Sequence, residues 1–220
     1  MIRISIDGAC RRNGKPDCVS AAGAFVQIFE DNKLVFTETL YGNEHGSTNQ
    51  RGELHALILA LGVVAKELDD TQIITDSEYI FNAMTKCWYA TWKARGWHTA
   101  SGGQVKNADL WKQIAQLVDK CGDADINYYH IKGHCIPFGR VTAENLLIKD
   151  TLGSSLMYAV YDKYDAVVST KKEVFEAAQE LSLKNNGFKL SDEVLRDFVV
   201  ANTVADAIAT SIVELADRKI

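Results

Sequence analysis

The chain has 220 residues, of which 47% are hydrophobic and 24% charged, with only two prolines. This balance is typical of one large or two small globular domains, and it excludes disordered, collagen-like and low-complexity chains. The formal net charge of −5 excludes a globally basic nucleic-acid binder but leaves room for a local basic patch.

Alternating polar and apolar residues predict three strands in the N-terminal part of the chain, and the first is expected to stop at Asp7-Gly8. The second and third, over 21–29 and 34–41, are joined by a polar turn and form a hairpin. Thr48 opens a helix with apolar residues at three- and four-residue spacing. A short strand over 71–75 follows, and Asp76-Ser77 caps the next helix.

The second half of the chain is mostly helical. We expect a helix over 108–120, a last strand over 125–131, and helices within 142–198. A final helix runs from about Asn202 to Ala216. Strands and helices in this order predict an α/β fold in which helices cover the faces of a mixed sheet.

Two features bear on where the protein works. No apolar run reaches the roughly 18–20 residues of a membrane span, and the N-terminus lacks a signal-peptide stretch. The five cysteines are odd in number and form no CxxC pair, which argues against a disulfide framework. We therefore expect a cytoplasmic protein in a reducing environment, with no membrane partner.

Four acidic residues lie where strands end or helices begin: Asp7, Glu53, Asp76 and Asp206. Each alone has an ordinary explanation as a turn residue, a helix cap or a partner of the helix dipole. Groups just beyond strand ends and at helix starts nevertheless converge on one crevice of an open sheet. Carboxylates so close repel unless a cation neutralises them, and oxygen ligands suit Mg²⁺ or Mn²⁺.

The residues around these acids form blocks in a fixed order. The blocks are Asp7-Gly8-Ala9-Cys10 with Asn13-Gly14, Thr48 to Leu54, Thr75 to Tyr79, the tryptophan-rich stretch 88–111, Ile131 to His134, and Asn202 to Asp206. Together they resemble the type 1 branch of the ribonuclease H family. The resemblance spans residues 1–135 and about 199–217. It implies a mixed five-stranded sheet whose first three strands are antiparallel, flanked by helices.

The resemblance also implies an activity. The family hydrolyses the RNA strand of RNA–DNA hybrids and leaves 5′-phosphate and 3′-hydroxyl ends. Two Mg²⁺ ions, which Mn²⁺ can replace, would clamp the scissile phosphate. Asp7 would bridge both ions, Asp76 and Asp206 would complete the site of the attacking water, and Glu53 would hold the second ion.

His134 matches the family's mobile histidine and would assist proton movement or product release, since an imidazole titrates near neutrality. The ordinary alternative is a loop histidine with no duty. Asn13, Asn49 and Gln50 are suited to hydrogen-bond the 2′-hydroxyl that marks an RNA strand. Asn49 and Gln50 can equally serve as helix-capping residues.

The stretch between Lys86 and Lys112 holds five basic residues and one acidic residue. It resembles the family's basic protrusion, in which cations meet DNA phosphates and aromatic rings meet sugars. Candidate contacts are Trp88, Lys93, Arg95 and Lys106. The alternative for the tryptophans at 88, 92 and 111 is packing that stiffens this arm.

The chain departs from the family in one respect. Compact relatives place few residues between the histidine and the last carboxylate, whereas 206 − 134 is 72 here. Spacing alone would nominate Glu144, but the residues around Asp206 match the family's last helix. We therefore expect a catalytic domain formed by 1–135 and 199–220 and a helical insertion over 136–198. This insertion is slightly acidic, which favours a lid or buttress over a second nucleic-acid grip and leaves partner docking open.

Two other functions stay open at this point. A non-catalytic hybrid-binding module would follow if the insertion displaced the last helix and removed one carboxylate. A nuclease of the same fold with another nucleic-acid substrate is the third reading. The basic, tryptophan-rich arm favours cleavage of hybrids.

Overall fold

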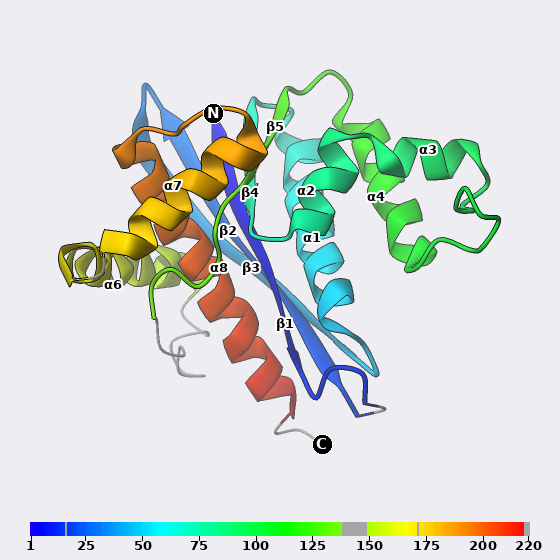
Figure 1. The fold of residues 1–220 in the computed structure, drawn as a ribbon, viewed down its shortest axis with the longest axis horizontal. Coiled ribbons are helices and arrows are strands. Elements are labelled where there is room, and N and C mark those ends of the chain that lie inside the picture. Colours follow the sequence, from blue (N-terminus) through cyan, green and yellow to red (C-terminus); the bar gives the residue numbers. More distant parts are fainter. Residues whose placement is uncertain (16, 138–148, 171, 218–220) are drawn as a thin grey trace.

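The fold is built on one mixed sheet of five strands, as the sequence predicts. The computed structural model describes residues 1–15, 17–137, 149–170 and 172–217. The strands are β1 (Ile2–Arg11), β2 (Val19–Glu30), β3 (Lys33–His45), β4 (Thr71–Thr75) and β5 (Ile126–His130). Their order in the sheet is β3-β2-β1-β4-β5 (Figure 1). The first three strands pair antiparallel, and β4 pairs parallel with both β1 and β5.

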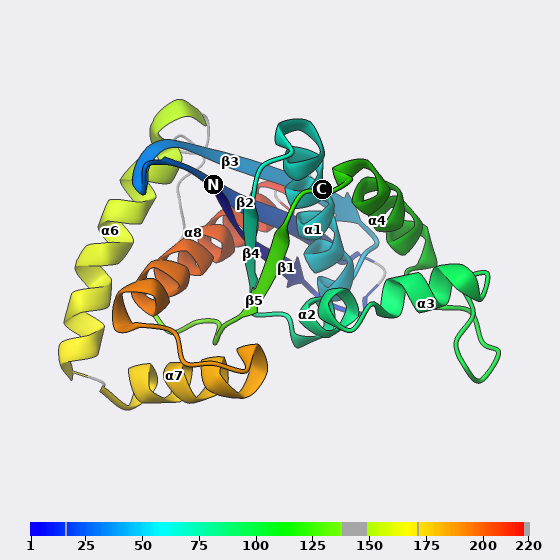
Figure 2. The ribbon, with the colours of Figure 1, turned by 90° about the horizontal axis from the view of Figure 1, so that it is seen from above.

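Helices cover both faces of this sheet (Figure 2). One face carries α1 (Asn49–Glu67), α2 (Glu78–Thr85) and α4 (Ala108–Cys121), and α3 (Trp88–Ala94) projects beyond it. The other face carries α8 (Asp192–Asp217), while α6 (Lys149–Thr170) packs on α8 and β3 and α7 (Lys172–Asn186) lies against β5. Each face has its own apolar core. Along β1, Ile2, Ile4 and Ile6 face the α1 side, so Asp7 points to the α8 side by the alternation of strand side chains.

The first strand runs past the expected stop at Asp7-Gly8 and ends at Arg11, because its antiparallel pairing with β2 continues to Arg11↔Val19. The hairpin brings Cys10 and Cys18 together, and the two form a disulfide with their Cα atoms 6.9 Å apart. The sequence argued only against a disulfide framework and did not predict this single pair, because cysteine count and spacing do not reveal a hairpin partner. Among the described cysteines, the other three are free: Cys87, Cys121 and Cys135.

The last helix is longer than expected. It begins at Asp192 rather than near Asn202, because Leu195, Phe198 and Val199 extend the buried face of the helix towards its N-terminus. Asp206 therefore lies in the middle of α8 and not in its first turns. By length and composition α8 could cross a membrane, but 78% of its most apolar window is buried against the rest of the protein. It is the central helix of one core.

The close approach of α8 to the sheet depends on Gly23 in β2. A Cβ at this position would lie 2.5 Å from the Ala205 carbonyl oxygen and 2.9 Å from the Ala209 nitrogen. Both of those atoms belong to backbone and cannot turn away, so only glycine allows this contact. Because Ala205 precedes Asp206, Gly23 also sets how near Asp206 comes to the sheet.

We expect Gly23→Ala to lower the free energy of unfolding by about 1–3 kcal/mol, because α8 must shift away from β2. Gly62→Ala, in α1, is the matched control. A Cβ at Gly62 meets no atom within 4 Å, so helix propensity should raise stability by up to about 1 kcal/mol. Urea unfolding of both variants measures the difference, and equal stabilities would contradict this account of the α8 contact.

Candidate active site

Asp7 and Asp76 lie side by side because of the sheet register. The last parallel pair of β1 and β4 is Ile6↔Thr75, so each aspartate is the next residue on its strand. The Ser77 side chain then accepts a hydrogen bond from the Ile80 nitrogen and caps α2. The chain therefore turns away into a helix directly after Asp76, and its carboxylate stays at the edge of the sheet.

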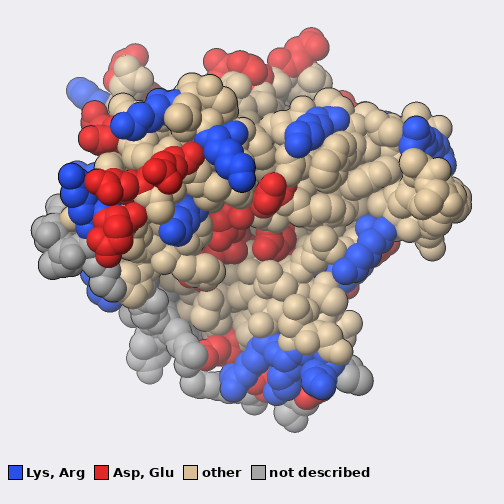
Figure 3. Space-filling view, viewed as in Figure 1, with Lys and Arg blue, Asp and Glu red and all other residues tan. Residues whose placement is uncertain are grey.

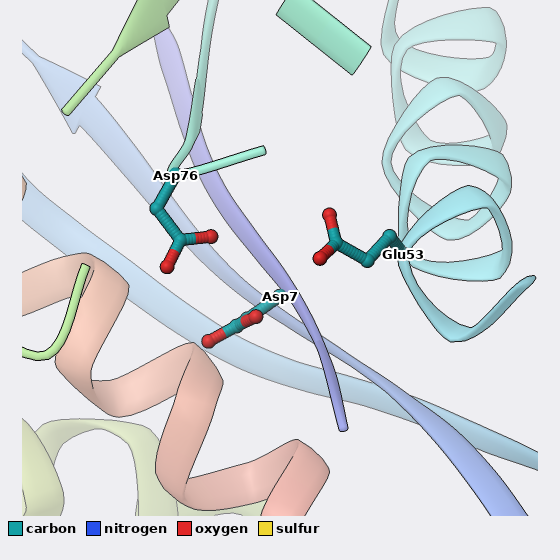
Figure 4. Close-up of side chains that lie close together, drawn as sticks. All are labelled: Asp7, Glu53 and Asp76. Atoms are coloured by element: carbon teal, nitrogen blue, oxygen red, sulfur yellow. The ribbon is translucent and has the colours of Figure 1, made fainter. Parts of the chain in front are cut away.

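Glu53 reaches the same place from α1. Thr48 caps this helix by accepting from the Arg51 nitrogen, which starts the helix beside the end of β1. A Cβ on Gly8 would lie 2.3 Å from the Glu53 nitrogen, so this glycine permits the helix to touch the strand. One ligand atom from each of Asp7, Glu53 and Asp76 lies within 4.8 Å of the others (Figure 4).

Asp206 completes the group from α8, on the other side of Asp7. The negative charge of Asp206 acts on the pKa of both Asp7 and Asp76. Thr210 donates to its Oδ1 at 3.2 Å, and the His134 Nδ1 lies 3.3 Å from its Oδ2. Asp206 and His134 thus lie beside the three clustered carboxylates, although Asp206 is not among the residues whose ligand atoms lie within 4.8 Å of one another. Glu144, the alternative fourth carboxylate, lies outside the described residues.

The loop after β5 is pressed against this cluster. A Cβ on Gly133 would lie 1.8 Å from the Asp76 Oδ2, so any larger residue would force the Asp76 carboxylate to shift. Gly133 therefore lets His134 follow closely, with 76% of the His134 side chain exposed. An exposed imidazole at the rim of an acidic site is free to move toward a ligand or away from it.

The electrostatics of the cluster favour a bound cation. Burial raises the pKa of Asp7 well above its ordinary value, and the charges of Asp76, Asp206 and Glu53 raise it further. Burial likewise raises the pKa of Glu53 to about 7. The Asp7 Oδ2 is buried and has no hydrogen-bond partner among the described residues. Divalent cations suit this set of oxygens, because they satisfy the orphaned oxygen and remove the repulsion.

The expected substrate-binding amides form a short chain of contacts beside Glu53. The Asn13 Oδ1 accepts from the Asn49 nitrogen at 3.3 Å, and the Asn49 Nδ2 donates to the Glu53 Oε1 at 3.2 Å. The Gln50 Oε1 accepts from the Asn107 Nδ2 at 3.3 Å. The Cys10–Cys18 disulfide joins the two ends of the loop that carries Asn13. Asn49 therefore contacts the cluster directly, Asn13 contacts Asn49, and Gln50 contacts Asn107 instead. The role of these amides toward a substrate stays a prediction.

The arm is formed by α3 and the loop to α4, and it projects from one side of the molecule (Figures 1 and 2). Trp88 and Trp92 are partly buried against the α1 side core, and the Trp92 ring lies 5.2 Å from the ring of the fully buried Trp111. The packing interpretation thus holds for these tryptophans. Exposed basic side chains remain available on the arm: Lys93, Arg95 and Lys106. Lys93 also pairs with Asp119 at 2.7 Å.

Sequence reasoning missed a second set of contacts behind Asp76. The His130 Nε2 lies 3.0 Å from the Asp76 carbonyl oxygen, and its Nδ1 lies 2.5 Å from the Asn185 Nδ2. The Asn186 side chain accepts from the His130 nitrogen and donates to its carbonyl oxygen, at 2.9 and 3.1 Å. No pattern in the sequence indicates that the two asparagines at the end of α7 contact His130.

The metal-free protein should lose stability as pH rises. The pKa of Glu53 is about 7 in the folded state, above its ordinary 4.5, so folding binds a proton between these values. Its contribution is present below pH 4.5 and lost as pH rises through 7, by up to about 3 kcal/mol. Urea unfolding in EDTA at pH 5 and pH 8 measures the loss.

Glu53→Gln should flatten this pH dependence, because the glutamine does not titrate. Glu30→Gln, on the surface, is the control and should leave the pH dependence unchanged. Adding Mg²⁺ or Mn²⁺ at pH 8 should restore stability to the unsubstituted protein through mass action. An unchanged pH dependence of stability in Glu53→Gln would contradict the assignment of a raised pKa to Glu53.

Comparison with known proteins assigns the chain to a family. A family model described as RNase H matches residues 2–146. The Ribonuclease H of Albidiferax ferrireducens is 38% identical over 133 residues, which cover 60% of this chain and 82% of that protein. The Ribonuclease H of Francisella tularensis subsp. novicida is 36% identical over 143 residues, covering 65% of this chain and 86% of that protein.

Solved structures agree with this result. LC9-RNase H1, a type 1 RNase H with the type 2 active-site motif, is 26% identical with a TM-score of 0.51, over 60% of this chain and 63% of that chain. The foamy viral protease-reverse transcriptase in complex with an RNA/DNA hybrid is 18% identical with a TM-score of 0.52, over 70% of this chain and 19% of that chain, and it shares the fold. The chain therefore belongs to the RNase H family and is a nuclease of the hydrolase class.

Proposed function

We propose that this protein hydrolyses the RNA strand of RNA–DNA hybrids with two Mg²⁺ ions, which Mn²⁺ can replace, and leaves 5′-phosphate and 3′-hydroxyl ends. The observation that carries the proposal is the convergence of Asp7, Glu53 and Asp76 within 4.8 Å, with Asp206 acting on Asp7 from α8. Membership of the RNase H family supports the substrate class.

The four carboxylates would hold the metal ions. Asp7 is the natural centre, because it is the most buried and the other three all act on it. Bound divalent cations would supply the positive charge that lowers the pKa of a water molecule and stabilises a leaving 3′ oxygen. The protein holds the carboxylates at fixed places on β1, α1, the end of β4 and α8, so little reorganisation is needed when substrate binds.

Other residues would bind and orient the hybrid. Asn13, Asn49 and Gln50 present amides beside Glu53, where a ribose 2′-hydroxyl distinguishes RNA from DNA. The exposed cations of the arm, Lys93, Arg95 and Lys106, suit the phosphates of the DNA strand, with Trp88 beside them. Figure 3 shows acidic side chains near the centre of one face of the molecule, with basic side chains around them.

His134 would move a proton or help to release product from the Asp206 side of the site. Its imidazole lies 3.3 Å from the Asp206 carboxylate and is mostly exposed. Neighbouring atoms therefore do not block either role. The loop that carries it is held at Gly133 against Asp76. The backbone of His134 would thus stay in place while its side chain moves.

The alternative of a non-catalytic hybrid-binding module is weaker. It required the insertion to displace the carboxylate of the last helix, whereas Asp206 lies at the cluster. A pure binder also has no use for buried carboxylates that repel one another. A nuclease of the same fold with another nucleic-acid substrate is separated from the main proposal by a substrate panel.

Asp76→Asn should lower the cleavage rate of a labelled RNA–DNA hybrid in Mg²⁺ by about a thousandfold or more, because one metal ligand charge is lost. Folding should be preserved, since the substitution keeps the volume and removes a repulsion. Asp123→Asn, an exposed position, is the matched control. Hybrid, duplex RNA, duplex DNA and single strands are compared, and cleavage of every substrate except the hybrid would refute the proposal.

His134→Ala should lower kcat by about a hundredfold, the range of proton-transfer assistance, with little change in KM or Tm. The side chain is exposed, so its loss leaves no cavity. His45→Ala on the surface serves as the control. Steady-state kinetics on the hybrid give both constants, and an unchanged kcat would return His134 to the role of an ordinary loop residue.

A further inference from the structure

An open groove of about 640 Å³ lies between α2, the edge strand β5 and the C-terminal end of α7. Figures 1 and 2 agree in placing these three segments side by side. One wall comes from the α2 side, with Asn82 and Lys86. The other comes from the end of α7 and the residues after it, with Lys184 and Phe188. This second wall lies beyond the residues that match the RNase H family model.

The α7 wall is held firmly in place. In a strand, the N–H and C=O of one residue point to the same side, and this side alternates along the strand. The Ile131 nitrogen donates to the Thr75 carbonyl oxygen on β4, so the backbone groups of His130 point to the free edge of β5. Asn186 pairs with both groups, at 2.9 and 3.1 Å, as a neighbouring strand would. Asn185 contacts the His130 ring. The groove is therefore formed before any ligand arrives.

One end of the groove lies near the carboxylate cluster, although none of the four acids lines it. Glu78, at its inner end, is two residues from Asp76, and the His130 ring that anchors α7 also contacts the Asp76 carbonyl oxygen. Basic side chains lie above the acidic centre of this face in Figure 3. A nucleic-acid strand that passes Asp76 would thus lie close to the Glu78 end of the groove.

The side chains of the groove match the chemistry of a nucleic-acid strand. Lys86 and Lys184 are exposed, and neither forms an ion pair with the described residues. The Phe188 ring is 50% exposed and lies nearly perpendicular to the Tyr129 ring, with 6.3 Å between the ring centres, so half of its surface is available for stacking. Cations that follow a backbone and aromatic rings that stack on bases are the usual elements of single-strand binding.

We propose that this groove binds unpaired nucleotides that continue the RNA strand beyond the hybrid at the active site. The proposal rests on the proposed function, since the hybrid places the strand at the entrance. It makes α7 a second nucleic-acid contact. The slight acidity of the whole insertion argued against such a contact, but that average does not describe the end of α7, where Lys184 lines the groove.

The test measures binding by fluorescence anisotropy, with the full chain carrying Asp76→Asn so that the strand stays intact. The probes are a blunt hybrid and the same hybrid with unpaired RNA nucleotides at its 5′ or its 3′ end. We expect one of the two extensions to tighten Kd at least about fivefold, the effect of stacking one base. The ratio of the blunt to the extended Kd is the readout.

Two matched pairs of variants assign that ratio to the groove. Lys184→Glu should abolish the gain and reduce the salt dependence of extended-probe binding by about one ion, whereas Lys189→Glu, on the same segment but outside the groove lining, should keep it. Phe188→Ala should abolish the gain, whereas Leu183→Ala, an equally exposed apolar residue of α7, should keep it.

Equal affinity for all three probes would overturn the proposal, as would equal losses in a groove variant and its control. The proposed function is tested separately, by cleavage of the blunt hybrid with the unsubstituted chain in Mg²⁺. If that cleavage fails, single-stranded RNA replaces the hybrid as the probe. Weaker binding of this RNA by Lys184→Glu and Phe188→Ala, but not by their controls, would still support the groove, and no difference would refute it.

Discussion

The structure is organised around the mutual repulsion of carboxylates that the fold forces together. Asp7 is buried on β1, and the charges of three other acids raise its pKa beyond the effect of burial alone. Four acids from β1, α1, the end of β4 and α8 cannot lie together without a cost in stability. Such a cost persists only where a ligand offsets it, and divalent cations are the ligand that these oxygens suit.

Close backbone contacts, rather than long side chains, make this convergence possible. Gly8 lets the first turn of α1 touch β1, Gly133 lets the loop after β5 touch Asp76, and Gly23 lets α8 approach β2. Each glycine stands where a Cβ would meet a backbone atom or a carboxylate. The positions of the acids are therefore set by rigid elements, which is the condition for a preorganised site.

The long segment between His134 and Asp206 does not displace the last carboxylate, because α8 packs along β1 and β2 like a core helix. Helices α6 and α7 are accommodated at the edges of the structure: α6 along β3 and α8, and α7 along β5. The asparagines at the end of α7 satisfy the free backbone groups of His130. Through this contact, a segment far from Asp76 in the sequence supports the strand next to it and forms one wall of a groove.

The sheet, its first helices and the acids were readable in the sequence, because strand alternation, helix caps and acid-bearing motifs are local patterns. Thr48 and Ser77 cap the expected helices, and the short strand over 71–75 has the expected bounds. The end of β1, the start of α8 and the Cys10–Cys18 pair were not readable. Pairing with β2 extends β1, burial against the sheet extends α8, and a hairpin brings the two cysteines together. The same holds for His130 with Asn185 and Asn186, since contacts between residues more than fifty positions apart depend on packing, which no local pattern encodes.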